Sequence, residues 1–427
     1  MTLTDRLAQF ALTDAHHLPD SAKSVMALSL IDWMGCALAG RDEPVTNVVR
    51  RLANDEGGAP QAHLVGGGQA PARMAALVNG TASHALDYDD THFAHIGHPS
   101  VAVVPCALAI AERTESDGAA FQEAALIGVE LSVRVGLWLG RDHYQIGFHQ
   151  TATAGAFGAA AAAGRLLGFD ARQMAASLGL VATRASGLKA QFGTMGKPFN
   201  AGIAASNGVE AALLIANGLV PNPNALEDFG ATHSGSDMKD ALDAIGSKWL
   251  FEDVSHKFHA CCHGLHAALE AFGEVGEERR NVVRITVHTH PRWLSVCNQP
   301  APDTGLGCKF SYRAVLALAM AGHDTSRLDT FSDQFAGAPD LVGMRDRITV
   351  LGDESVSETG TRLVLQMADG SERHVAHDLL TPLPLETRRA KIMAKAAALM
   401  GAERAERVAR HVTERAAPSI LARELGG

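Results

Sequence analysis

Charged and aromatic residues are scarce in this chain of 427 residues: 20% are charged and 5% are aromatic, while 47% are hydrophobic. The formal net charge is −10, which argues against nucleic acid as a partner because phosphate binding requires a basic face. Long hydrophobic runs are missing too. The longest stretch without Asp, Glu, Lys or Arg, residues 143–164, is mostly Ala and Gly, and it is too weakly hydrophobic to cross a bilayer. We expect neither nucleic acid nor membrane as a partner.

Other signals are missing as well. Six cysteines over this length give no disulfide framework and suit a reducing compartment. The first residues, MTLTDRLAQF, are polar and acidic where a signal peptide would be apolar, so we expect a cytoplasmic protein. A Walker lysine and a G-x-S-x-G elbow are absent, and the glycines at 66–68 lack the flanks of a dinucleotide site. Cys261 and Cys262 are adjacent, without the C-x-x-C spacing of a zinc site, and are expected to be core residues.

The periodicity of apolar residues changes once along the chain. Up to about residue 275 it predicts helices, at 22–38, 101–113, 121–139, 151–167, 201–217 and 264–272. After residue 280 it predicts strands at 282–290, 347–351, 362–367 and 372–377, the last two joined at Asp369-Gly370, with helices at 312–321 and 386–400. The chain is too long for one core. We therefore expect a mainly α protein with a large all-helical domain (1–275 plus 386–427) and a smaller α+β domain (276–385).

Titratable residues crowd into one segment, DYDDTHFAHIGHPS at 87–100. Proximity and burial push the pKa values of such groups apart, which is what acid–base chemistry at neutral pH needs. His92, His95 and His98 follow one another at three-residue intervals, so a metal site is the alternative. The segment is nevertheless typical of a loop, and aspartate beside histidine is better explained as a pair that fixes the imidazole tautomer. We expect a site without metal, with a metal-dependent hydrolase as the rival.

Three polar motifs share one position, immediately before a predicted helix. They are His98-Pro99-Ser100, His149-Gln150-Thr151 and Lys197-Pro198-Phe199-Asn200, and a weaker fourth is Lys257 with Cys261-Cys262-His263 before the helix that carries His266. Helix N-termini attract anions through exposed N–H groups and the helix dipole. Taken singly, Ser100, Thr151 and Asn200 could be ordinary caps. Together the motifs predict a site for a small polycarboxylate, with His and Lys as acid and base.

Several long blocks resemble the MmgE/PrpD family, in order over most of the chain. They are DWMGCALAG (32–40), NGTASHALDYDDTH (79–92), GHPS (97–100), GFHQTATAGAFGAAAAAGRLLG (147–168), FGTMGKPFNAGIAASNGVEAALL (192–214), KFHACCHGLHAALEA (257–271) and KFSYRAVLALAMAGH (309–323). The family includes 2-methylcitrate dehydratase, cis-aconitate decarboxylase and iminodisuccinate epimerase. The resemblance implies an all-helical domain plus a small α+β domain, a homodimer, and no metal or organic cofactor.

The resemblance also implies a set of active-site residues. It places Asp87, Thr91, His98, His149, Lys197 and Lys257 in the site, with Tyr144 and His266 close by. The chain departs from the pattern at three positions: many relatives have His at Asn200, a basic residue at Ile203 and Arg at His263. Fewer cationic groups suggest a substrate with fewer carboxylates, or one different from methylcitrate.

The chemistries of the family share proton transfer at a carbon next to a carboxylate. We expect His149 or His98 to be the base, Asp87 to orient one imidazole, and the other histidine or Tyr144 to supply a proton. Lys197, Lys257 and the helix N-termini would stabilise the enediolate-like charge. Of the possible reactions, a hydro-lyase of the 2-methylcitrate dehydratase type is favoured. Epimerisation and decarboxylation are the alternatives, and a non-catalytic binding protein is a further rival.

Overall fold

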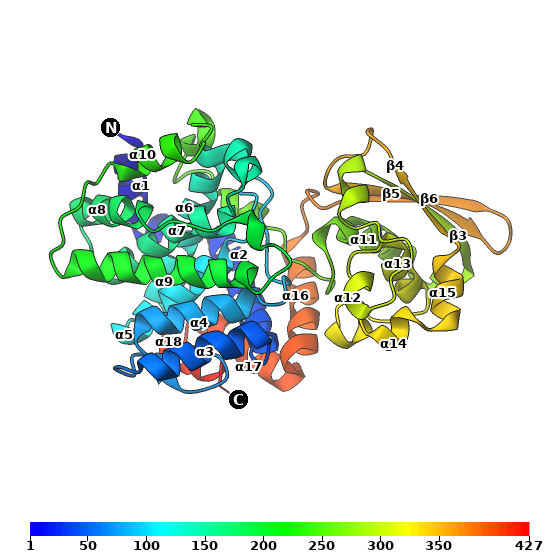
Figure 1. Cartoon of the computed structure of the whole chain (residues 1–427), viewed down its shortest axis with the longest axis horizontal. Coiled ribbons are helices and arrows are strands. Elements are labelled where there is room, and N and C mark those ends of the chain that lie inside the picture. Colours follow the sequence, from blue (N-terminus) through cyan, green and yellow to red (C-terminus); the bar gives the residue numbers. More distant parts are fainter. Residues whose placement is uncertain (427) are drawn as a thin grey trace. The chain divides into compact units, whose positions relative to one another are not determined.

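The protein consists of two compact units in a computed structural model that describes residues 1–426 (Figure 1). The helical unit comprises Met1–His256 and the segment from Ile392 onward, and the second unit comprises Lys257–Lys391. The first is built of helices apart from a two-stranded ribbon, and the second contains a four-stranded sheet with helices. The expected fold class, mainly α with a smaller α+β domain, is confirmed.

The helices of the helical unit are joined by loops of different length, and the loop at 85–99 between α4 and α5 contains the titratable segment. Most of the predicted helices are present with ends shifted by a few residues. The elements are α1 (Leu3–Ala11), α2 (Asp20–Ala39), α3 (Pro44–Glu56), β1 (Ala62–His63), β2 (Gln69–Ala70), α4 (Ala72–His84), α5 (Ser100–Arg113), α6 (Gly118–Ile146), α7 (Gln150–Leu166), α8 (Ala171–Ala182), α9 (Gly196–Ala216), α10 (Ala225–Thr232), α17 (Ala402–Thr413) and α18 (Pro418–Arg423), and α16 (Leu385–Met400) begins in the second unit and ends in this one.

Small residues let the central helices approach closely. α7 is buried from Gln150 to Gly164 and packs against α5, α6 and α9. A Cβ atom on Gly158 of α7 would lie 2.3 Å from the carbonyl oxygen of Gly128 in α6. A Cβ on Gly202 of α9 would lie 2.4 Å from the carbonyl oxygen of Leu77 in α4. Any side chain at either glycine would push two helices apart, so the Ala- and Gly-rich composition is what brings the helix starts together.

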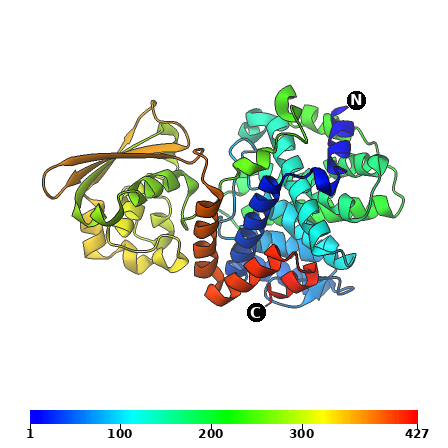
Figure 2. The same cartoon turned by 180° about the vertical axis from the view of Figure 1, so that it is seen from behind.

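Two helices, α2 and α9, are long and apolar enough to pass a length-and-composition test for a membrane span. Most of each one is nevertheless buried inside the structure. The C-terminal helices return to the helical unit, where α17 packs on α2 and α18 packs on α5 (Figure 2). α2 and α9 are therefore explained as core helices, which are apolar for the same reason as membrane helices.

The start of α9 differs from the expectation. The sequence predicted a helix from residue 201, with Lys197 and Asn200 before it, but α9 begins at Gly196. Proline lacks an N–H group, and the first helical turn has no intrahelical use for one. Pro198 is therefore compatible with the first turn, Lys197 lies inside that turn, and Asn200 directly follows it in the helix.

The second unit is built on a mixed sheet with strand order β4-β3-β5-β6. β3 pairs in parallel with β4 and antiparallel with β5, and β5 and β6 form the predicted hairpin, in which Gly370 has a φ of 83°. Its elements are α11 (His266–Gly273), β3 (Val282–Thr289), α12 (Gly305–Cys308), α13 (Tyr312–Met320), α14 (Asp333–Ala336), α15 (Pro339–Arg345), β4 (Ile348–Gly352), β5 (Gly360–Met367) and β6 (Glu372–Asp378).

The unit boundaries differ from those expected from sequence. The sequence placed them at 275/276 and 385/386, whereas the contacts divide the chain at 256/257 and 391/392. The difference lies mainly in α11, which is helical like the residues before it but packs on β5 and β6. Helical periodicity alone cannot tell which core a helix joins.

Candidate active site

The titratable segment is a loop between α4 and α5 in the helical unit. Asp87 has a left-handed backbone, with a φ of 52°, a conformation that Asp tolerates better than most residues. Its side chain is 44% exposed, while Asp89 and Asp90 are buried. The turn therefore presents one carboxylate outward and two inward.

Three helix starts meet beside this loop. His98 donates its backbone N–H to Thr151 Oγ1 at 3.0 Å, which joins the start of α5 to that of α7. Asn200, just after the first turn of α9, lies 3.3 Å from the ring of His149, the residue before α7. Lys197, in the first turn of α9, lies 2.7 Å from Asp87. The structure thus brings Asp87, His98, His149 and Lys197 together, and the N-termini of α5, α7 and α9 all contribute.

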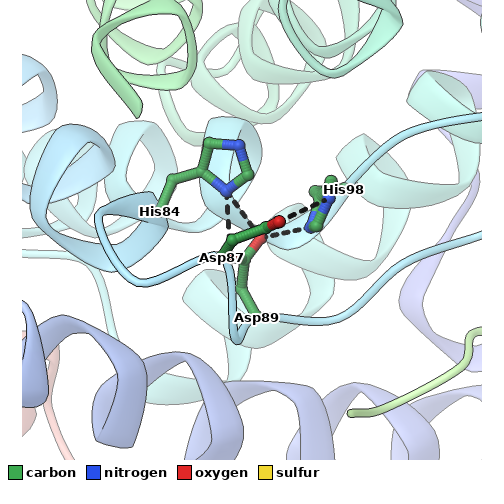
Figure 3. A group of neighbouring side chains, drawn as sticks. All are labelled: His84, Asp87, Asp89 and His98. Carbon is green, nitrogen blue, oxygen red and sulfur yellow. Dashed lines mark hydrogen bonds and ion pairs between the residues drawn. The ribbon is translucent and has the colours of Figure 1, made fainter. Parts of the chain in front are cut away.

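Asp89 lies between two imidazole rings (Figure 3). Its carboxylate oxygens lie 2.9 Å from Nδ1 of His84 and 2.7 Å from Nδ1 of His98. Burial alone would raise the pKa of Asp89, but His84 and His98 hold it well below its usual range. Asp89 is therefore ionised at neutral pH, and one buried carboxylate orients both rings.

His98 also contacts a second carboxylate. Its Nε2 lies 3.3 Å from Oδ1 of Asp87, while its Nδ1 faces Asp89. A ring with a carboxylate at each nitrogen is stabilised as the doubly protonated imidazolium, because both nitrogens must then carry a hydrogen to bond. Asp87 in turn contacts Lys197, so the groups alternate in charge from the lysine to Asp89.

His149 has the opposite electrostatic environment. It is almost completely buried, and burial lowers the pKa of its imidazole well below 6.5, with the charges of His84, Lys197 and His98 adding to that effect and Asp87 opposing it. Its ring is stacked with that of His84, with centroids 5.9 Å apart, and forms a T-shaped pair with the ring of Phe192. The site therefore holds one imidazole that favours the cation and one that is neutral at pH 7.

Buried polar and charged groups contact the loop at Tyr88 and Asp90. Lys395 of α16 lies 2.6 Å from Asp32 of α2 and donates to the carbonyl oxygen of Tyr88 at 2.6 Å. Asp90 accepts from the hydroxyl of Ser100 at 2.5 Å. Burial raises the pKa of Asp90 to about 7, and the hydrogen bonds from Ser100 only partly offset this. These contacts position the loop that carries Asp89.

The evenly spaced histidines do not act together. His92 contacts the carbonyl oxygen of Leu250 at 2.7 Å, and His95 contacts the hydroxyl of Ser132 at 3.2 Å. Their rings therefore have other partners than the ring of His98, because the loop does not form a single helical face. A different set, His84, Asp87, Asp89 and His98, has ligand atoms within 4.8 Å of one another. Ligands of these types at this spacing could hold a cation. However, Asp87 already contacts the Lys197 ammonium group and the His98 ring, and Asp89 contacts the rings of His84 and His98.

The remaining predicted site residues lie at several places. Thr91 pairs with Ser255 by backbone hydrogen bonds. Tyr144, near the end of α6, makes a cation–π contact with Lys189, whose Nζ lies 3.8 Å from the centroid of the tyrosine ring. Lys257 is the first residue of the second unit, and His266 begins its helix α11. Burial lowers the pKa of His266 well below 6.5, and His263, His259 and Lys257 add to the effect.

Sequence reasoning missed four residues of this arrangement. His84 was unassigned because it lies in the last turn of α4, outside the polar loop. Asp89 was named only as part of the crowded segment, and Asp32 and Lys395 lie far from it in sequence. The block NGTASHALDYDD, with a histidine five residues before Asp89, is the one signal that could have indicated the His84 pair.

A helical domain that gathers Asp, His and Lys at its helix starts, combined with a small α+β domain, defines a recognisable class of two-domain proteins. Residues 5–236 match the MmgE/PrpD N-terminal domain, and residues 259–415 match the MmgE/PrpD C-terminal domain. The chain belongs to the MmgE/PrpD family, whose similar characterised members are enzymes.

Three relatives show what the chain is similar to. The cis-aconitate decarboxylase-like protein oryM of Aspergillus oryzae (strain ATCC 42149 / RIB 40) is 25% identical over 388 residues, which cover 80% of this chain and 78% of that protein. Cis-aconitate decarboxylase of Aspergillus terreus is 26% identical over 383 residues, 80% and 77% respectively. Human cis-aconitate decarboxylase is 30% identical over 261 residues, 56% and 52% respectively.

Proposed function

We propose that this protein is a cofactor-independent enzyme that transfers protons at a carbon next to a carboxylate of a small di- or tricarboxylate. The observation that carries the proposal is the position of His98, whose ring nitrogens lie 2.7 Å from Asp89 and 3.3 Å from Asp87. This geometry favours an imidazolium, a proton donor that is only slightly exposed. Lys197 and the starts of α5, α7 and α9 supply the positive potential for substrate carboxylates.

The reaction we favour is decarboxylation of an unsaturated tricarboxylate. Three similar proteins carry cis-aconitate decarboxylase in their names. In such a reaction the C–C bond to one carboxylate breaks, and the electron pair passes onto the neighbouring alkene and carboxylate as CO₂ leaves. A proton from a general acid such as His98 then completes the product, and solvent restores the acid. The reaction needs a proton donor and stabilised charge, both of which the site can supply.

Dehydration, the reaction favoured from the sequence, is the second candidate. It requires a base for the carbon-bound proton and an acid for the departing hydroxyl. The presence of one neutral ring, His149, and one ring that favours the cation, His98, supports it. Epimerisation would use the same two groups on opposite faces of one carbon.

Incubation in D₂O with citrate, methylcitrate, aconitate, tartrate and iminodisuccinate, followed by proton NMR, tests the proposal. Loss of CO₂ with deuterium in the product indicates decarboxylation, a new alkene signal without loss of CO₂ indicates dehydration, and deuterium uptake without net change indicates epimerisation. His98→Gln should abolish any turnover, whereas the matched variant His92→Gln, which keeps a donor for the carbonyl oxygen of Leu250, should retain it. No reaction with any compound, or full activity in His98→Gln, would contradict the proposal.

We also propose that the enzyme is a cytoplasmic homodimer. The charge of −10 and the six free cysteines support a reducing aqueous compartment, and the family resemblance supports the dimer. Light scattering of the purified chain would test the assembly, and a monomeric mass at micromolar concentration would contradict it.

A further inference from the structure

Asn200 contacts the buried ring of His149 through its amide nitrogen. Nδ2 lies 3.3 Å from His149 Nδ1 and 3.3 Å from the carbonyl oxygen of Leu188. The Leu188 oxygen can only accept a hydrogen bond, so it must face the NH₂ group of the amide rather than its oxygen. The second hydrogen of that NH₂ group then points at Nδ1 of His149, which must accept it through its lone pair.

The backbone around residue 187 holds both partners in place. The N–H of His149 donates to the carbonyl oxygen of Gly187 at 2.9 Å, and Leu188 forms a bridge with Phe148. Gly187 has a φ of 144°, and a Cβ atom there would lie 2.6 Å from Ala152 Cβ in α7. The strand-like segment 187–188 therefore fixes the His149 main chain and the Asn200 amide at once. A shift of the His149 main chain or of the Asn200 amide would break a contact with the same short segment.

His149 carries a single ring hydrogen at neutral pH. Its environment disfavours the imidazolium, because it is buried beside His84, His98 and Lys197 with only Asp87 opposing. A neutral imidazole has one N–H and one bare nitrogen. Since Nδ1 accepts from Asn200, the hydrogen resides on Nε2. Among the hydrogen bonds described for residues 1–426, none involves Nε2 of His149.

We propose that Asn200 is a positioning residue that fixes His149 as the Nε2–H tautomer, so that His149 presents a neutral N–H donor rather than a base. Its catalytic meaning rests on the proposed function: the donor would stabilise charge on a substrate oxygen while His98 supplies the proton. A neutral imidazole that donates to a developing oxyanion is an established way to stabilise such charge. This arrangement suits decarboxylation, in which no carbon-bound proton has to be removed.

The tautomer can be measured without any substrate. The full chain is labelled with ¹⁵N in its histidine rings, and two-bond proton–nitrogen correlation spectra are recorded at neutral pH, with His149 assigned by its absence in His149→Gln. We expect a protonated Nε2 and a bare Nδ1. Asn200→Asp offers only acceptors and should place a hydrogen on Nδ1, and Asn200→Ala should leave both tautomers populated. A wild-type spectrum with protonated Nδ1 would overturn the inference whether or not the variants fold.

Asn207→Asp is the matched control, since Asn207 lies two turns further along α9 and contacts Arg184 instead. It should leave the His149 signals unchanged, and a change like that of Asn200→Asp would assign the effect to added charge on α9 and overturn the inference. With a substrate from the panel, Asn200→Asp should lower kcat by about 10²-fold and move the acidic limb of the pH–rate profile. If no compound reacts, the proposed function fails while the spectrum still decides the tautomer.

Discussion

Replacing Asp89 by Asn should abolish most activity while changing few atoms. The carboxylate of Asp89 serves two rings, with distances of 2.9 Å to His84 and 2.7 Å to His98. An amide has one oxygen, so one of the two rings would face an NH₂ group and would have to reverse its tautomer. The charge that stabilises the imidazolium of His98 would be lost at the same time.

The expected size follows from these two contacts. A hydrogen bond to a charged group contributes about 1.5–3 kcal/mol, and with an ion pair to His98 of similar strength the two contacts contribute about 3–6 kcal/mol. If that stabilisation is needed in the transition state, kcat should fall by about 10² to 10⁴-fold. Loss of the equivalent aspartate in a serine-protease triad, which also fixes an imidazole tautomer, costs about 10⁴-fold.

Asp90→Asn is the control for this experiment. Asp90 is the next residue, is equally buried, and contacts Ser100 rather than a histidine. Rates for both variants would be measured by NMR on the reacting compound, with circular dichroism to verify folding. A folded Asp89→Asn enzyme with near-normal kcat would refute the role given to Asp89, and an equal loss in Asp90→Asn would show that the effect is not specific to the histidine pair.

Further variants test the other charged groups. Lys197→Ala should lower kcat/KM by about 10²-fold through loss of substrate charge stabilisation, and Lys197→Arg should recover part of it in the same assay. Lys395→Met should destabilise the fold by about 3–5 kcal/mol in urea unfolding, because the buried carboxylate of Asp32 loses the ammonium group of Lys395; the double variant with Asp32→Asn should lose less. The free energy of unfolding of Asp90→Asn, relative to that of the wild type, should increase by about 2–3 kcal/mol as the pH rises from 5 to 8. The reason is that Asp90, with a folded pKa of about 7 against 3.8, loses its stabilising contribution as pH rises through that window. Chelator treatment followed by metal analysis should leave turnover unchanged, whereas activity lost and then restored by zinc or iron would favour the metal site.

Much of the fold could be predicted from local patterns. The starts of α5 and α7 lie at Ser100 and Gln150, within a residue of the expectation, because a polar residue before an Ala-rich run is a strong local signal. The β5–β6 hairpin follows from Asp369-Gly370, since Gly370 supplies the positive φ that the turn requires. The start of α9 was misplaced because Gly196 and Pro198 both indicate a break, although proline is compatible with a first turn.

The site was only partly predictable for a different reason. Residue type and spacing indicated the loop, but they could not show which carboxylate serves which ring. His92 and His95 looked equivalent to His98, and only the path of the chain separates them. The contact of Lys395 with the carbonyl oxygen of Tyr88 spans more than three hundred residues, and no local pattern reports on such a pair. Site geometry is therefore set by tertiary contacts that the motifs alone do not contain.

Asp89 and Asp90 show how those contacts decide chemistry. The two carboxyl groups are neighbours in sequence and equally buried, yet the pKa of one is held well below its usual range and that of the other is raised to about 7. The partners of the two groups differ: Asp89 meets two imidazole rings, whereas Asp90 meets the hydroxyl and the backbone N–H of Ser100. Asp89, which has positive partners, keeps its charge and stabilises the imidazolium of His98. Asp90, whose pKa is raised, is partly protonated at neutral pH. If both were ionised without the rings, the repulsion between them would oppose folding of the loop, so His84 and His98 are as necessary to the structure of the loop as to its chemistry.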